Sequence, residues 1–301
     1  MDLVTRILYT LLGLFIILNW GLLMGAFMRK LVARVGKRVG IRWYQPWINL
    51  FKLYGKRNSI SHGAMFYLGP VFRLVGGVGL VVFMPLIFGS PYFENFSFTG
   101  DLILLLYFKF FGMLGMALGA GEEGHPYAGI GITRGLAQIT TVELPFTLAI
   151  IAIAVQYNTL SISEIVEAQQ GGVMNWTFFT NPVATLAALL SILGIFMHSP
   201  FNLHQAPNEI PIGPPTEYSA SFLGVLRTNA AVLHVIEAVL FMNLFFGGAT
   251  SWIELIVKTF FIYFYSVFVG VVFPRFRIEQ SVTWFLKVPL ALGILAIILI
   301  I

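Results

Sequence analysis

The chain has 301 residues, of which 58% are hydrophobic and 10% are charged, with a formal net charge of +5. This composition excludes a water-soluble domain and indicates that the bilayer is the solvent, as does the mean hydropathy of +0.86. The chain has no cysteine, which excludes disulfides and thiolate-held clusters, so any redox centre must belong to a partner.

Eight apolar runs approach the length of about 20 residues that a helix needs to cross a bilayer. We expect spans at 3–28, 65–88, 102–119, 133–157, 182–198, 222–247, 252–273 and 284–301. Eight spans and their connections use the whole chain, which predicts one all-α, polytopic transmembrane domain over 1–301. The first run is too long for a signal-peptide core and lacks a small-residue cleavage site, so we interpret it as a retained helix.

The positive residues predict the orientation. Nine of the 18 Lys and Arg lie in 29–64, which has no acid, whereas the connections near 89–100 and 158–181 have no Lys or Arg. Cationic loops stay cytoplasmic. The expected inner loops are 29–64, 120–132, 199–221 and 274–283. Both termini should then lie outside a multi-pass plasma-membrane protein.

The first inner loop alternates basic and aromatic residues in RVGKRVGIRWYQPWINLFKLYGKR (34–57). One interpretation is an interfacial helix held by aromatics and anionic lipid. The alternative is a docking surface for a cytoplasmic partner, and beside a membrane we do not expect that partner to be nucleic acid. The candidate docking residues are Lys37, Arg38, Arg42, Trp43, Gln45, Pro46 and Lys52.

Ionisable residues interrupt the third and fourth spans. A charge at mid-membrane costs about 3 kcal/mol or more, so each such residue is a functional candidate. Lys109 lies midway along the third span, where its simpler role is a helix–helix hydrogen bond. Glu143 lies inside the fourth span near Pro145, which invites a kink, and Arg134 opens the same helix. The plain alternative is an interfacial Arg134 and a neutral Glu143.

Further titratable residues lie at inner helix ends and in the sixth span. Glu122 and Glu123 are adjacent in GAGEEGHPYAGIG (119–131), and like-charge neighbours raise one another's pKa. The sixth span carries Arg227, His234 and Glu237. His234 and Glu237 share a helix face. Two ligands are weak evidence for a metal site, so a proton relay fits better.

The loop SPFNLHQAPNEIPIGPPTEYS (199–219) carries four prolines between Pro207 and Pro215, together with Glu209, Glu217 and His204, and no Lys or Arg. Proline restricts the backbone, which favours a loop that shifts between a few discrete arrangements. We expect Glu209 and Glu217 to work as a pair in such a switch. The plainer interpretation is a solvated acidic cap over the helix ends.

Three ordered motifs resemble the family of the H-type membrane protein (subunit 1) of respiratory complex I and its relatives in membrane-bound group 4 NiFe hydrogenases and the archaeal sulfane sulfur reductase. They are KRVGIRWYQPWINLFKLYGKR, HPYAGIGITRGLAQITTVELP and SPFNLHQAPNEIPIGPPTEYS, and the similarity covers nearly the whole chain. The resemblance implies that Glu143 is the buried glutamate of a cavity-lining helix and that Arg134 is the arginine before it. It also implies that Glu209 and Glu217 belong to the acidic path toward antiporter-like subunits.

The residues that depart from the family pattern indicate which branch of the family this chain resembles most. Ile41 and Arg42 follow Gly40 where quinone enzymes have another motif, which favours a ferredoxin-linked hydrogenase or sulfur reductase. The third motif has fewer acids than the family pattern. Asn202 follows Pro-Phe, and His204, Gln205 and Asn208 lie in the middle of the motif.

The expected function is a non-redox membrane subunit of a ferredoxin-linked, ion-pumping oxidoreductase. It would anchor the cytoplasmic electron-transfer arm and couple its redox chemistry to H⁺ or Na⁺ translocation. We expect no cofactor and no complete catalytic site in this chain; iron–sulfur clusters, and a NiFe-type centre in the hydrogenase branch, belong to partners. The expected partners are iron–sulfur and hydrogenase-like large and small subunits, antiporter-like membrane subunits and lipid.

Three alternatives remain open: a quinone-binding subunit of a complex I-like enzyme, a stand-alone secondary transporter, and a purely structural anchor. The absence of an evident inverted repeat argues against the transporter.

Overall fold

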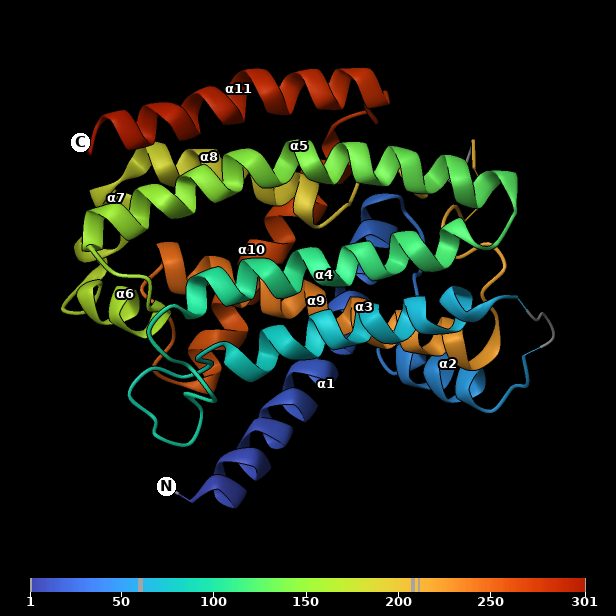
Figure 1. Cartoon of the computed structure of the whole chain (residues 1–301), viewed down its shortest axis with the longest axis horizontal. Helices are drawn as coiled ribbons and strands as arrows, with labels where there is room; N and C mark the ends of the chain where they lie inside the picture. The colour runs from blue at the N-terminus through green and yellow to red at the C-terminus, as the bar shows by residue number, and fades with distance from the viewer. Residues whose placement is uncertain (1, 59–61, 207–208, 211, 301) are drawn as a thin grey trace. The chain divides into compact units, whose positions relative to one another are not determined.

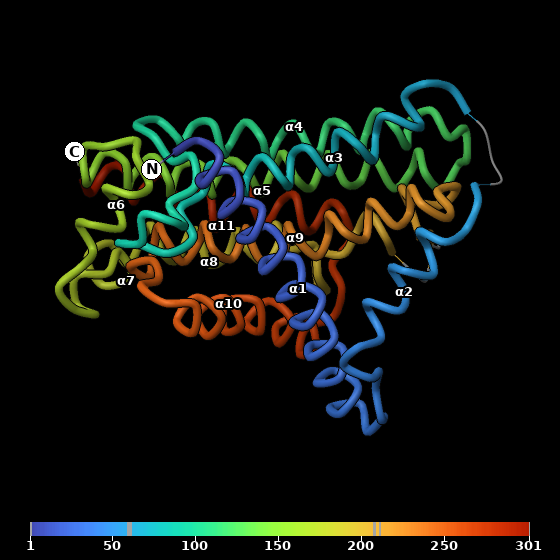
Figure 2. Tube along the Cα trace, turned by 90° about the horizontal axis from the view of Figure 1, so that it is seen from below, coloured from blue at the N-terminus to red at the C-terminus, as the bar shows by residue number. Residues whose placement is uncertain are grey.

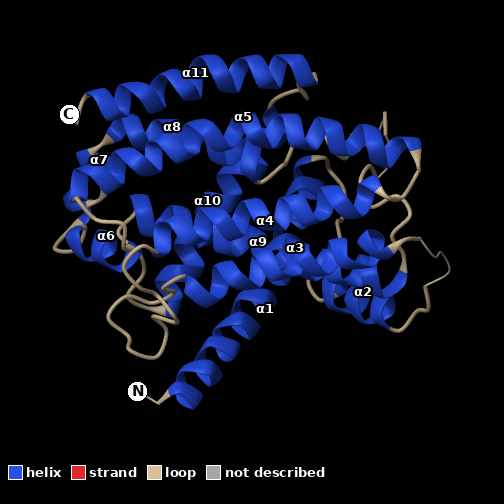
Figure 3. Cartoon of the chain, viewed as in Figure 1, coloured by secondary structure: helices blue, strands red, loops and turns tan. Residues whose placement is uncertain are grey.

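The computed structural model describes residues 2–58, 62–206, 209–210 and 212–300. Throughout these ranges the regular elements are helices, without a strand (Figure 3). Among the described residues, seven helices are long and apolar enough to cross a membrane. They are α1 (Leu3–Val35), α3 (Ala64–Phe83), α4 (Asp101–Gly121), α5 (Pro126–Tyr157), α9 (Ala220–Phe245), α10 (Trp252–Val272) and α11 (Ile278–Ile298). The polytopic all-α prediction is confirmed.

The predicted fifth span is shorter than the others. It forms α8 (Pro182–Ile195), whose 14 residues cover about 21 Å, less than the roughly 30 Å of a hydrocarbon core. Its start is fixed by Asn181, whose side chain accepts a hydrogen bond from the backbone N–H of Ala184 at 3.1 Å. This cap separates α8 from the short α7 (Thr177–Thr180), so the eight predicted spans become seven long helices and a short one.

Helices extend beyond the predicted spans because hydropathy marks the lipid boundary and not the helix end. The first helix, α1, continues to Val35 through its basic last turns, and α5 begins at Pro126 inside the predicted inner loop. Pro145 lies within α5, which remains one continuous helix. The connections contain three further short elements: α2 (Gln45–Tyr54), α6 (Ile162–Ala168) and the 3₁₀ turn η1 (Val173–Asn175).

The chain forms two compact units, each assembled from three segments. The first unit contains Met1–Val82, Leu105–Ile132 and His204–Glu237. The second contains Phe83–Leu104, Thr133–Leu203 and Ala238–Ile301.

In the first unit, glycines let α3 and α4 approach backbone to backbone (Figure 1). A Cβ on Gly76 would lie 2.6 Å from the Cα of Gly112, and a Cβ on Gly69 would lie 2.7 Å from the Cα of Gly119. Gly69 and Gly76 are seven residues apart on α3, and Gly112 and Gly119 are seven residues apart on α4. The glycines therefore form one stripe along each helix. Van der Waals packing of this kind stabilises helix association in lipid, because the hydrophobic effect does not favour contact between helices there.

The short α2 is held to two long helices of the same unit. The chain turns back after α1 into α2 (Figure 2), and the Trp47 indole N–H donates to Asn19 Oδ1 of α1 at 2.9 Å. At the other end, the hydroxyls of Tyr54 and Thr228 of α9 share a hydrogen bond at 2.9 Å. These contacts fix the basic loop to the membrane helices.

In the second unit, α8 and α11 lie side by side and pack with α5 (Figure 1). Val142, Leu193, Phe201 and Phe285 form a buried cluster between them. At the opposite end of this unit, the Lys258 ammonium of α10 caps the chain after α9 by donating to the carbonyls of Phe246 at 2.7 Å and Gly248 at 2.6 Å. The same ammonium lies 2.5 Å from Glu254 and 4.4 Å from the centre of the Trp176 ring.

Candidate functional site

Titratable side chains from three connections meet at the first turn of α3 in the first unit. Glu122 and Glu123 follow α4, Glu217 precedes α9, and His62 precedes α3. We call these four residues, together with Tyr218, the α3 acid cluster. The sequence singles out the three acids but does not bring them together.

Glu122 caps α3 from outside that helix. Its Oε2 accepts a hydrogen bond from the backbone N–H of Phe66 at 2.6 Å. A carboxylate at the N-terminal end of a helix satisfies a free N–H and is favoured by the helix dipole. A Cβ at Gly63 would collide with this carboxylate, so a larger residue there would displace Glu122 from its hydrogen bond to Phe66. Glu122 is itself exposed to solvent.

Glu123 is the buried acid of the cluster, with 3% of its surface exposed. Its Oε2 accepts a hydrogen bond from the backbone N–H of Glu217 at 3.3 Å. Its Oε1 has no hydrogen-bond partner within the part of the chain that the structure describes. Burial raises the pKa of Glu123 to about 8; the hydrogen bond opposes this rise, and the charge of Glu217 adds to it. With this pKa, the carboxyl of Glu123 is mostly protonated at neutral pH.

The physical cause of the raised pKa of Glu123 differs from the cause that the sequence predicts. The sequence predicts that repulsion between the neighbours Glu122 and Glu123 raises their pKa values. The pKa of Glu123 is instead raised mainly by burial, and the acid that adds to the shift is Glu217, 94 residues away in sequence.

Glu217 joins Glu123 to a histidine. Its Oε2 lies 2.6 Å from Nε2 of His62, and about a fifth of each side chain is exposed. The pair is an ion pair when His62 is protonated. Glu217 thus faces Glu123 with its backbone and His62 with its carboxylate, so a movement of this one residue changes both contacts.

Tyr218 lies beneath the acids. Its hydroxyl donates to the carbonyl of Phe66 at 2.9 Å, and the two rings stack with centroids 4.3 Å apart. Burial raises the pKa of Tyr218, with smaller contributions from the charges of Glu123 and Glu122, so it remains a proton donor. Sequence reasoning missed Tyr218 and His62; the signals were a tyrosine next to Glu217 and a histidine next to a span.

The remaining acid of the proline-rich loop, Glu209, differs from Glu217 in its surroundings. Glu209 is exposed, and its backbone N–H donates to the carbonyl of Ala206 at 2.9 Å. His204 is half-buried, and its carbonyl closely approaches Gly213, whose φ is +67°. Pro207, Asn208 and Pro211 lie outside the described residues. The expected pairing of Glu209 with Glu217 stays a prediction.

A second polar group lies along the membrane-spanning helices of the first unit. Lys109 is buried, with 6% exposed, and His234 and Glu237 are half-buried on α9. Arg73 of α3 is close enough to Glu237 for electrostatic interaction. Sequence reasoning missed Arg73, although a single arginine within GPVFRLVGG (69–77) was the signal. Arg227 is exposed.

Two predicted residues lie in the second unit, both half-buried on α5: Arg134 and Glu143. Between them is Gln138, which is fully buried and donates to the carbonyl of Phe201 at 2.7 Å. This bond ties α5 to the start of the proline-rich loop, and nothing in the sequence pattern predicts it.

The predicted docking residues form an exposed basic–aromatic face. Lys37, Arg38, Arg42, Trp43 and Lys52 are exposed, and Gln45 and Pro46 are half-buried at the start of α2. Arg42 donates to the Tyr44 hydroxyl at 2.6 Å, which holds a guanidinium against an aromatic ring. The partner of this face stays a prediction.

The comparisons with known proteins agree on one family. The model of the family described as NADH dehydrogenase matches residues 7–301. The H subunit of the NADH-quinone oxidoreductase of Helicobacter acinonychis (strain Sheeba) is 29% identical over 88% of this chain and 87% of its own length. The second H subunit of the NADH-quinone oxidoreductase of Syntrophobacter fumaroxidans (strain DSM 10017 / MPOB) is 30% identical over 88% and 86%.

Among solved structures, the fold is similar to a chain of the membrane-bound sulfane sulfur reductase, an archaeal respiratory membrane complex. The two chains are 32% identical with a TM-score of 0.91, over 98% of this chain and 99% of the other.

Proposed function

Because this chain belongs to the NADH dehydrogenase family, as a membrane subunit of a complex I-like respiratory oxidoreductase, we propose that it couples redox events in a soluble arm to ion translocation. The arm docks on the basic–aromatic face of residues 34–57. The coupling group is the α3 acid cluster. A ferredoxin-linked enzyme that reduces sulfane sulfur or protons is the branch we propose, in the plasma membrane with residues 29–64 inside.

The observation that carries the proposal is the burial of Glu123, whose Oε2 accepts a hydrogen bond from the backbone N–H of Glu217. Because its pKa is about 8, a change of about two pKa units, or about 3 kcal/mol, moves Glu123 from mostly protonated to mostly ionised. The charge of Glu217 adds to the raised pKa of Glu123, so neutralising Glu217 lowers that pKa and favours proton release. The hydrogen bond from the Glu217 backbone N–H opposes the rise, so a movement of Glu217 changes both contributions.

A short series of contacts in the first unit connects the docking face to this cluster. Tyr54 at the end of α2 is bonded to Thr228 of α9, and the Asn58 amide donates to Ser221 Oγ at 3.2 Å. Ser221 lies in the first turn of α9, directly after the segment that holds Glu217 and Tyr218. Displacement of α2 by a docked arm therefore acts on the start of α9 and on Glu217.

The mechanism needs no cofactor in this chain. Reduction in the arm shifts α2 and the start of α9, which moves the Glu217 carboxylate relative to His62. When His62 neutralises the Glu217 charge, the proton affinity of Glu123 falls; when the pair separates, the proton affinity of Glu123 rises. The cycle between these states moves a proton at Glu123 once per redox event.

The test measures ions translocated per electron by the purified complex in sealed vesicles. Glu123→Gln keeps the side-chain shape but cannot titrate, so electron transfer should continue while the ion gradient collapses. Glu122→Gln is the matched control: it is the neighbouring acid and its amide oxygen can still accept from Phe66. An unchanged ion-to-electron ratio in Glu123→Gln would refute the coupling role and leave the structural-anchor alternative.

A second candidate is a quinone-binding subunit, because the bacterial relatives are named as subunits of NADH-quinone oxidoreductases. Quinone-dependent turnover of the purified complex separates the two candidates. The ferredoxin-linked proposal predicts no such turnover.

A further inference from the structure

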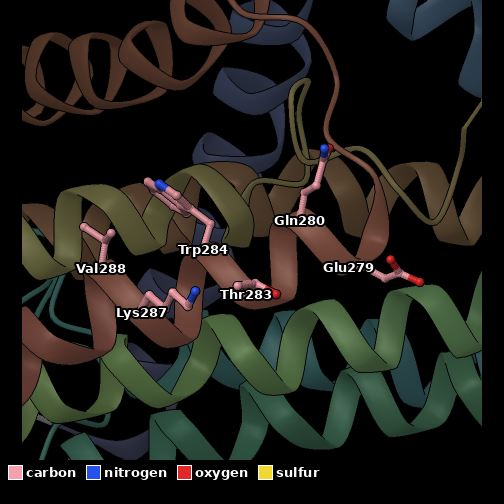
Figure 4. Close-up of a pocket in the computed structure, with 6 residues that line it drawn as sticks. All are labelled: Glu279, Gln280, Thr283, Trp284, Lys287 and Val288. Atoms are coloured by element: carbon pink, nitrogen blue, oxygen red, sulfur yellow. The ribbon is translucent and has the colours of Figure 1, made fainter.

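A shallow pocket of about 400 Å³ lies on the outward face of α11 in the second unit (Figure 4). Its lining residues are Glu279, Gln280, Thr283, Trp284, Lys287 and Val288. The inward face of the same helix carries the buried residues Ser281, Phe285, Pro289, Gly293 and Ala296, which recur every three or four positions. The pocket therefore faces away from the protein core.

The surroundings of α11 change from polar to apolar at the pocket. Before the pocket and at its N-terminal end, Arg277, Glu279 and Gln280 are exposed. From Leu286 onward the exposed side chains are mostly apolar, with Leu286 at 39%, Val288 at 44% and Ile298 at 63% exposed. Such a belt faces hydrocarbon, and Trp characteristically marks its edge. The change from exposed polar residues to exposed apolar ones between Gln280 and Leu286 indicates where the headgroup layer meets the hydrocarbon.

Lys287 is an exposed cation at the start of this apolar belt. It makes no hydrogen bond or ion pair with the residues that the structure describes. Its side chain runs back along α11 toward Thr283 (Figure 4), which brings the ammonium toward the headgroup level. A lysine in this position extends its ammonium to the interface, because leaving its charge against hydrocarbon is costly. An ammonium at this level attracts anionic headgroups.

The neighbouring polar groups complete a headgroup site. Gln280 Oε1 accepts the backbone N–H of Arg277 at 3.0 Å, which fixes the side chain and leaves its NH₂ as a donor. Thr283 lies one turn from Lys287 on the same row. Glu279 lies a further turn away, about 12 Å from Lys287 along the axis, too far to neutralise it.

We propose that the α11 pocket binds the headgroup of an anionic phospholipid. The phosphate lies on Lys287 and Thr283, Trp284 borders the glycerol level, and Glu279 accepts a hydrogen bond from a hydroxyl beyond the phosphate. Phosphatidylglycerol has this arrangement of groups.

A carboxylate on a neighbouring membrane helix is the competing occupant. Close helix contacts in lipid favour small residues, whereas this face presents Trp284 and Lys287. The ammonium also lies toward the headgroup layer, where phosphate is concentrated.

The test uses the purified complex with phosphatidylglycerol that carries a photo-reactive group on its headgroup. Mass spectrometry of the α11 peptide should find the label. Lys287→Gln should lower labelling by about fivefold, corresponding to about 1 kcal/mol for one cation at an anionic membrane surface. Lys287→Arg should retain the label. Glu279→Gln should reduce the preference for phosphatidylglycerol over phosphatidic acid, which has no hydroxyl beyond its phosphate.

Each outcome decides the proposal, provided that both Lys287 variants remain in the complex. An unlabelled α11 in the wild-type complex overturns it. Labelling that is equal in Lys287→Gln and wild type also overturns it. A cross-link between α11 and a neighbouring subunit, with no lipid label, assigns the face to a protein partner instead.

Discussion

Replacing Glu123 with Gln should make the protein more stable, by an amount that grows with pH. Glu123 has a pKa of about 8 in the folded protein against an ordinary value of 4.5. Below pH 4.5 the carboxyl is protonated in both states and costs nothing. As pH rises from 4.5 toward 8, only the unfolded state ionises, so the folded state loses stability. Above pH 8 this cost is complete.

The magnitude follows from the shift. About 3.5 pKa units at 1.36 kcal/mol each give a cost of about 5 kcal/mol above pH 8, and about 3 kcal/mol at pH 7. These are upper limits, because water entering the cluster reduces the effect of burial. The Gln variant lacks this cost at any pH.

Thermal inactivation midpoints of the purified complex between pH 5 and 9 measure this difference. The midpoint of Glu123→Gln should separate upward from wild type as pH rises and then run parallel above pH 8. The matched control, Glu122→Gln, should not show this divergence. A constant offset between Glu123→Gln and wild type across the whole range would show that Glu123 ionises normally and would refute the buried-proton account.

Three further predictions concern packing and docking. Gly76→Ala should destabilise the protein by about 1–3 kcal/mol in unfolding assays, because its Cβ would overlap the backbone of α4, whereas Gly25→Ala, with nothing within 4 Å, should be tolerated. Lys258→Met should cost about 2–3 kcal/mol, because it leaves two backbone carbonyls and a carboxylate without their cation; an unchanged unfolding midpoint would contradict this. Reversing the three docking cations Lys37, Arg38 and Arg42 to Glu should release the soluble arm in membrane flotation, with the charge-conserving triple variant Lys37→Arg, Arg38→Lys and Arg42→Lys as the control; retention of an active arm on the Glu variant would contradict the docking role.

The membrane fold was predictable because its signal is hydropathy, which is local. Seven of the eight predicted spans are long helices, and α8 is also helical. Its short length was not predictable, because the stretch 182–198 is uniformly apolar and only the cap at Asn181 shows where the helix starts. The continuation of α1 to Val35 was missed for the same reason, since its last turns are polar but still helical.

The candidate site was predictable in its residue types and not in its arrangement. Glu122, Glu123 and Glu217 stand out as acids near inner helix ends, but the distance between residues 123 and 217 in sequence hides their contact. Burial of Glu123 and exposure of Glu122 could not be separated, because adjacent residues have the same sequence surroundings. Only the tertiary packing shows that Glu122 caps α3 and that Glu123 is buried.

Two polar residues inside predicted spans were missed for different reasons. Arg73 stands alone in an apolar helix, so it forms no motif with its neighbours. Gln138 is a neutral residue between the charged Arg134 and Glu143, and its partner, the Phe201 carbonyl, belongs to a distant loop. A search for every polar residue within a predicted span, neutral as well as charged, would have found both.

The most direct test of the coupling account is infrared difference spectroscopy of the whole complex as its electron-transfer arm is reduced at pH 7. The account predicts a carboxyl band that changes on reduction, disappears in Glu123→Gln and persists in Glu122→Gln. A reduction-induced carboxyl band that is unchanged in Glu123→Gln, or the absence of such a band in the active wild-type complex, would contradict it.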